Sequence, residues 1–186
     1  LDLVVVLLAG ATALLPAFAR DILHAGPMAV GFLRASPAIG ALVCTLILAR
    51  WPLYRRMGAW MLGSVVVFGI GTIAFGLSKS LYLSCAMLAL TGGADAISVF
   101  VRQTLVQMLT TDAMRGRVSA VDMLFISASN ELGEFESGVA ARFLGPVGAV
   151  LFGGIGSVIV GFAWIKLFPT LAKVDRLQHV EAERTA

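Results

Sequence analysis

Long apolar stretches, separated by short polar or charged connections, run through almost the whole 186-residue chain. A membrane-spanning helix needs about 20 consecutive, mainly apolar residues. Charges, prolines and glycines divide the chain into stretches of roughly that length at residues 1–19, 29–49, 59–77, 81–109, 118–141 and 147–168. The pattern predicts one bundle of six transmembrane helices over residues 1–168, followed by a charged tail at 169–186.

The composition supports an all-α membrane protein. Hydrophobic residues make up 59% of the chain and charged residues 13%, whereas a soluble domain carries about a quarter charged residues. Helices satisfy their own backbone hydrogen bonds within lipid, and the period-2 alternation of a transmembrane barrel is absent. A net charge of +3 is too small to indicate a nucleic-acid partner.

The distribution of lysine and arginine predicts the orientation of the bundle. Cytoplasmic loops carry an excess of these residues. One side of the predicted bundle holds nine of them: Arg50, Arg55, Arg56, Arg115, Arg117, Lys166, Lys173, Arg176 and Arg184. The other side holds only Arg20, Lys79 and Arg142. Both termini of this segment are therefore expected in the cytoplasm.

The order of the predicted spans suggests an internal repeat. The third and sixth spans are glycine-rich and carry no charge in their interiors, whereas polar residues fall in the other spans. A triplet of spans that repeats after three crossings has inverted topology, which is a common transporter plan, although a glycine-rich third helix can also arise by chance. We expect two inverted three-helix repeats, with the third and sixth spans at the lipid-facing periphery.

Several ionisable residues fall inside the predicted spans, where they are costly unless they face the bundle interior or a water-filled path. Asp95 and Arg102 in the fourth span are seven residues apart, so on a helix they share a face. Each could form a static interhelical pair, or each could line a translocation path. The pattern leaves both alternatives open.

The fifth span carries further polar groups at Asn130, Glu131 and Glu134. The two glutamates are one turn apart, and Arg34 of the second span is expected at a similar depth. We therefore predict an Arg34–Glu134 ion pair, either static or switching, with Glu131 as an alternative partner. Glu136 faces elsewhere and is expected to be solvated near the outer interface.

The turn between the fourth and fifth spans contains Asp112, Arg115 and Arg117. Such residues usually cap helices and supply cytoplasmic positive charge, and they could also form an inner gating turn. Cys44 and Cys85 lie in apolar runs, which favours small packing residues over a disulfide or metal pair. No catalytic motif or metal-ligand spacing appears, so neither an enzyme nor a cofactor is predicted.

The segment RQTLVQMLTTDAMRGRVSAVDMLFISASNELGEFESG resembles major facilitator superfamily transporters of the enterobactin-exporter-like group. DAMRGRVSAV and NELGEFESG carry most of this resemblance, which extends over nearly the whole chain. It implies the second six-helix half of a twelve-helix protein, with the upstream half missing here. The basic loop WPLYRRMG keeps Arg55 and Arg56 but lacks the aspartate of the superfamily's loop motif.

The resemblance also implies export from a bacterial inner membrane by alternating access, driven by a proton gradient. Our hypothesis is a secondary active transporter in which Asp95, Glu131 and Glu134 take up protons and Arg34 and Arg102 are their counter-charges. Its partners would be the bilayer, a small-molecule substrate, protons and the upstream half. The rival hypothesis is a non-transporting six-span module for assembly or sensing.

Overall fold

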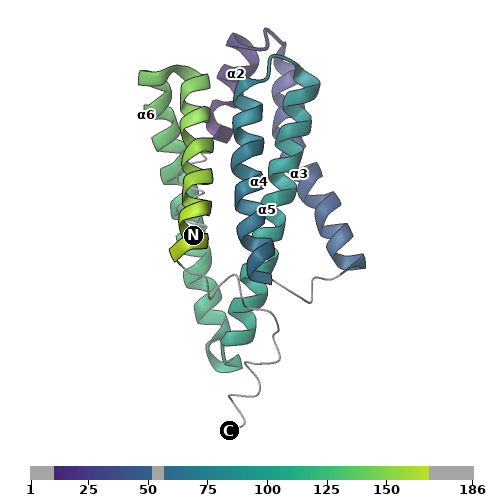
Figure 1. Ribbon diagram of the computed structural model, residues 1–186, viewed down its shortest axis with the longest axis vertical. Helices are drawn as coiled ribbons and strands as arrows, with labels where there is room; N and C mark the ends of the chain where they lie inside the picture. The colour runs from purple at the N-terminus through teal and green to yellow at the C-terminus, as the bar shows by residue number, and fades with distance from the viewer. Residues whose placement is uncertain (1–10, 52–56, 168–186) are drawn as a thin grey trace.

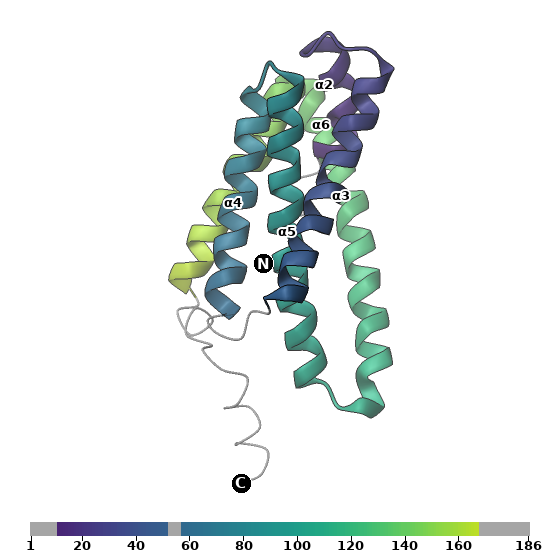
Figure 2. The ribbon, with the colours of Figure 1, turned by 90° about the vertical axis from the view of Figure 1, so that its right-hand side faces the viewer.

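The computed structural model describes residues 11–51 and 57–167, and the regular structure in these ranges is helical throughout. In chain order the elements are the 3-10 helix η1 (Ala11–Leu14), α2 (Leu15–Asp21), α3 (Pro27–Arg50), α4 (Met57–Leu77), α5 (Leu81–Leu109) and α6 (Asp112–Leu167). The long helices lie side by side along one axis (Figures 1 and 2). Four helices in the described ranges, α3 to α6, are long and apolar enough to cross a membrane.

Helices α3, α4 and α5 agree closely with the second, third and fourth predicted spans. Helix α3 begins at Pro27, whose fixed φ suits the first helical position. A serine cluster separates α4 from α5: Ser84 donates to Ser78 Oγ at 3.1 Å, and Ser78 donates to the Ser80 carbonyl at 3.0 Å. Most of the first predicted span, the 52–56 loop and the tail lie outside the described residues.

Helix α6 contains 56 residues, more than twice the length of one crossing. It is interrupted by Gly145, whose φ of 73° and ψ of 168° are non-helical, and Pro146 follows directly. We call residues 112–144 the first arm and residues 146–167 the second arm. The two arms run in opposite directions (Figure 1), and they correspond to the fifth and sixth predicted spans.

A compact apolar core joins one end of the bundle. Phe18 of α2 and Phe75 of α4 are fully buried, and their ring centroids are 4.5 Å apart. Leu33 of α3, Leu88 of α5 and Val150 of the second arm belong to the same cluster. Residues from five helical segments therefore meet here, and the short α2 is fixed against the long helices.

Glycines bring α4 and the second arm into close contact. A Cβ atom added to Gly69 would lie 3.0 Å from the carbonyl oxygen of Gly154, and one added to Gly154 would lie 3.1 Å from that of Gly69. Gly76 and Gly161, each seven residues further along its own helix, also face the partner helix at short range. Small residues thus allow the backbones to approach, as the sequence predicted.

The predicted third span, α4, packs against two neighbouring helices and keeps an exposed apolar side that includes Ile70 and Leu77. Helix α4 lies between α5 and α6. Of the most apolar stretch of α4, 50% is buried, compared with 17% for the corresponding stretch of α3. Its glycines form the predicted close contacts, Gly71 with α5 and Gly69 with the second arm, and the lipid-facing position of this helix remains a prediction. Helix α3 is the most exposed of the candidate spans in the described part of the chain.

Candidate functional site

The charged residues of α5 continue a stripe that begins in the apolar core. Leu88, Asp95 and Arg102 follow one another at seven-residue intervals, which places them within about 40° around the helix. Leu88 is buried in the core, Asp95 is exposed, and Arg102 is half-buried. The stripe therefore passes from the packed end of the bundle to a polar flank of α5.

Backbone contact between α3 and α5 fixes the helix that carries Arg34. A Cβ atom at Gly92 would collide with the Pro37 backbone, and one at Gly40 would collide with the Ala89 backbone. Arg34 lies one turn before Pro37 and is exposed, whereas its neighbour Leu33 is fully buried. The crossing thus holds the charged segments of α3 and α5 on adjacent helices.

The first arm of α6 presents Asn130, Glu131 and Glu134 as exposed side chains. Thr12 of η1 donates a hydrogen bond to Glu134 Oε1 at 3.4 Å. The predicted Arg34–Glu134 ion pair is absent from the described residues, and Glu131 does not replace Glu134 as the partner of Arg34. Within this part of the chain, the main contacts of α6 are with α4 and η1 rather than with α3.

Glu136 differs from its expected solvated state. The side chain is half-buried, and its Oε2 atom is fully buried without a hydrogen-bond partner in the described residues. The small residues Ser129, Gly133 and Ser137 are buried on the same side of the arm. Their spacing of four residues was the sequence signal that this side of the helix is packed.

The turn between α5 and α6 is held by Arg115. Its Nη2 atom donates to the carbonyl oxygen of Gln107 at 3.3 Å, so a cation satisfies a free carbonyl in the last turn of α5. Arg117 is exposed, and the side chain of Asp112 lies outside the described part of the chain. The expected capping role is thus seen for Arg115.

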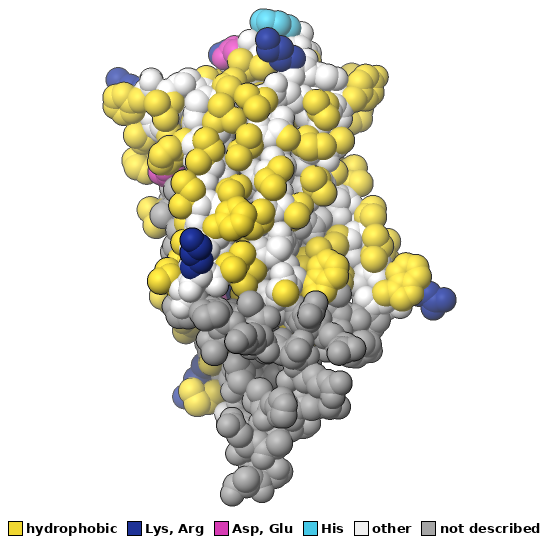
Figure 3. All heavy atoms as spheres, viewed as in Figure 1, with side chains coloured by type: hydrophobic (Ala, Val, Ile, Leu, Met, Phe, Trp, Pro, Cys, Tyr) yellow, Lys and Arg dark blue, Asp and Glu magenta, His cyan; other side chains and the backbone are white. Residues whose placement is uncertain are grey.

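Charged side chains on the visible face lie mainly at the ends and edges of a surface dominated by apolar groups (Figure 3). At one end, Arg20 Nε donates to Asp21 Oδ1 at 2.7 Å, and both residues are exposed. This hydrogen bond lowers the pKa of the Asp21 carboxyl below its ordinary value. The ion pair marks a polar connection between α2 and α3.

Comparison with known proteins identifies the family. Residues 3–184 match the model of the family MFS_3, described as transmembrane secretion effector. The enterobactin exporter EntS of Citrobacter koseri is 30% identical over 150 residues, which cover 81% of this chain and 36% of that protein. No solved structure matches the chain.

Two further relatives give the same result. The enterobactin exporters EntS of Escherichia coli strain SMS-3-5 and of Shigella flexneri are each 27% identical over 157 residues. These residues cover 84% of this chain and 37% and 38% of the two exporters, so the chain spans well under half of its relatives. The family match covers nearly all 186 residues, and the chain therefore belongs to the transmembrane secretion effector family of the major facilitator superfamily.

Proposed function

We propose that this chain forms the C-terminal half of a proton-coupled exporter that works by alternating access in a bacterial inner membrane. Membership of a secretion family supports a role in export. The matched segment of each relative is about the size of one six-helix bundle, which supports a second bundle upstream. The excess of basic residues on one side favours cytoplasmic termini for this segment.

The exposed charges on α3 and the first arm, which form no ion pair in the described residues, carry this proposal. Arg34, Glu131 and Glu134 lie within apolar helices, yet no ion pair in the described residues joins any two of them. A module stabilised by static buried pairs would satisfy these charges within the bundle, because unpaired charge in lipid is costly. Water in a transport path, or side chains of an upstream half, would satisfy them here.

The proposed path also includes the polar flank of α5. Asp95 and Arg102 would line it together with Asn130 of the first arm, and Asp95 would share proton uptake with Glu131 and Glu134. The turn that contains Asp112, Arg115 and Arg117 would serve as the inner gate. The contact between Arg115 and Gln107 would then keep α5 and the first arm together during opening.

The replacement Glu134→Gln tests the proton-coupling role. It preserves the shape of the side chain and its ability to accept from Thr12, but it removes the protonatable group. We expect proton-coupled efflux to fall by about 100-fold, the lower end of what positioned acid–base groups contribute. The measurement is efflux from inverted vesicles of cells that produce the full-length protein, with enterobactin as the first substrate tested.

The matched control for this experiment is Asp21→Asn. It also removes one carboxylate, but from an exposed connection outside the candidate spans, and it should leave efflux unchanged. The amount of protein in the membrane is compared by immunoblot. Wild-type efflux in the Glu134→Gln variant, with wild-type dependence on the proton gradient, would remove Glu134 from the mechanism.

A further inference from the structure

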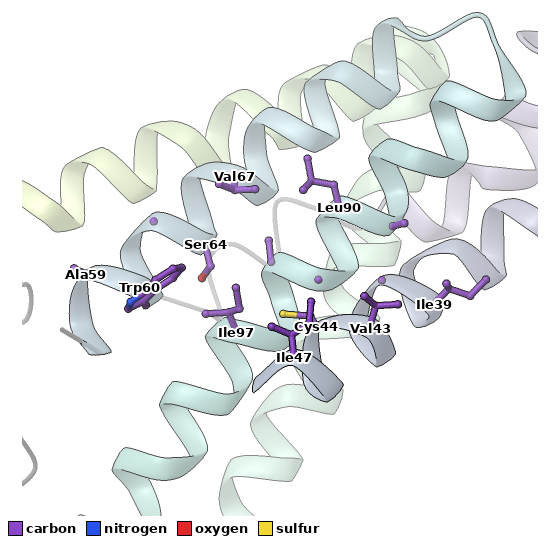
Figure 4. A pocket seen from close by; sticks show the side chains of 15 residues that line it. Ile39, Val43, Cys44, Ile47, Ala59, Trp60, Ser64, Val67, Leu90 and Ile97 are labelled. Carbon is purple, nitrogen blue, oxygen red and sulfur yellow. The ribbon is translucent and has the colours of Figure 1, made fainter. Parts of the chain in front are cut away.

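An apolar groove lies between α3, α4 and α5, on the side of α5 away from Asp95. Its cavity volume is about 760 Å³, within the usual range for small-molecule sites. The close-up view shows that side chains from the three helices converge on this space (Figure 4). Ile97 of α5 lines it, two residues after Asp95 and thus about 200° around the helix.

The lining of the groove suits a hydrocarbon chain. Val43 on α3, Val67 on α4 and Leu90 on α5 line it with partly exposed side chains. The hydroxyl of Ser64 also faces the groove, but it donates to the Met61 carbonyl at 2.8 Å. The hydroxyl proton is therefore already used, and the groove favours an apolar occupant.

An arginine of α3, Arg50, lies just beyond the residues that line the groove. Ile39, Val43 and Ile47 of α3 line the groove at intervals of one turn, and Arg50 follows Ile47 by three residues on the same face. Arg50 is exposed and makes no ion pair in the described part of the chain. Trp60, near the adjacent end of α4, also lines the groove, and tryptophan is enriched at membrane interfaces.

We propose that this groove binds a phospholipid, with one acyl chain between α3, α4 and α5 and its phosphate at Arg50. Moving an acyl chain from bulk lipid into an apolar groove gives little hydrophobic gain, because the surroundings are equally apolar. Selectivity therefore comes from the charge-assisted contact between guanidinium and phosphate. The site is separate from the proposed transport path and does not depend on it.

Gly63 provides a direct test, because a Cβ atom added there meets no atom within 4 Å and would enter the groove. The matched control is Gly31 on α3, which has the same open surroundings but does not line the groove. Native mass spectrometry of the purified full-length protein measures binding of phosphatidylglycerol. We expect Gly63→Trp to weaken binding at least tenfold and Gly31→Trp to leave it unchanged.

A second experiment tests the phosphate contact. It compares the binding of phosphatidylglycerol with that of a diacylglycerol that has the same acyl chains but no phosphate. Wild-type protein should prefer phosphatidylglycerol, and Arg50→Gln should reduce that preference about fivefold, as expected for one basic residue near a lipid phosphate. Arg142→Gln, which removes an exposed arginine away from the groove, should keep the preference. An unchanged preference in Arg50→Gln would overturn the proposed phosphate site.

Folding is checked by helicity and thermal unfolding of each variant. Gly63→Leu adds less volume and replaces Gly63→Trp in the binding experiment if the tryptophan variant is unstable. Because leucine fills less of the groove, Gly63→Leu should weaken phosphatidylglycerol binding about threefold. Folded Gly63→Trp or Gly63→Leu protein that binds phosphatidylglycerol as tightly as Gly31→Trp protein would show that the lipid does not occupy the groove.

Discussion

Glu134 and Glu136 are two residues apart on the first arm of α6, yet their surroundings differ. Glu134 is exposed and accepts a hydrogen bond from Thr12, whereas Glu136 has a buried oxygen without a partner in the described residues. Two positions correspond to about 200° around a helix. The arm therefore has one face on which a carboxyl group is exposed and another on which a carboxyl oxygen is buried.

The burial of Glu136 predicts that the apolar replacement Glu136→Met stabilises the protein. A buried polar atom without a hydrogen bond costs about 1–3 kcal/mol, and methionine removes that atom at similar length. We expect the free energy of unfolding in detergent to rise by about 1 kcal/mol. Glu136→Gln keeps a polar group in place and should gain less. A less stable Glu136→Met protein would show that the carboxyl group has a stabilising partner.

At the residue level, the sequence identified the charges but not their partners. The Arg34–Glu134 prediction compared the depths of the two residues in the membrane, calculated along two straight helices. It could not include η1, whose Thr12 contacts Glu134, and helical rise alone does not specify which helices are neighbours. The burial of Glu136 could have been predicted from the small residues on the same side of the arm, Ser129, Gly133 and Ser137.

The crossing of α3 and α5 depends on glycines at the level of the helices. We expect Gly40→Val to destabilise the bundle by about 3 kcal/mol, the upper range for an overpacked contact, because the side chain would meet the Ala89 backbone. Gly31→Val is the control on the same helix, since Gly31 has no neighbour within 4 Å. Thermal unfolding of the two variants measures the difference. Equal stability would contradict the close crossing.

The helix boundaries were the most predictable part of the fold. The polar residues between α4 and α5 and the proline at the start of α3 are strong local signals, and the structure agrees with them. The burial of α4 was not predictable, because an uncharged glycine-rich helix can face either lipid or another helix. The six-span count and the inverted repeat remain predictions, since most of the first span lies outside the described residues.

At the level of the whole molecule, α5 separates a polar flank from the apolar groove. Asp95 belongs to the polar flank and Ile97 lines the groove. In full-length protein with Cys44→Ala and Cys85→Ala, we expect Asp95→Cys to react with a water-soluble maleimide at least tenfold faster than Ile97→Cys, because thiolate formation requires water.

The labelling experiment also tests the rival non-transporting module. A dry bundle would protect both introduced cysteines, and similarly slow reaction at positions 95 and 97 would contradict the water-filled path. Labelling of denatured protein confirms that both thiols are present and reactive. The comparison needs no knowledge of the substrate, so it remains informative even if enterobactin is not transported.

The turn at Gly145 has a mechanical consequence. Gly145, with its positive φ, is the single residue between the two arms, and Pro146 follows it directly. The two arms are therefore joined without a flexible loop. Neither arm can slide along its axis by a full helical turn while the other stays fixed. A tilt of the first arm would therefore be transmitted through this turn to the glycine contacts between the second arm and α4.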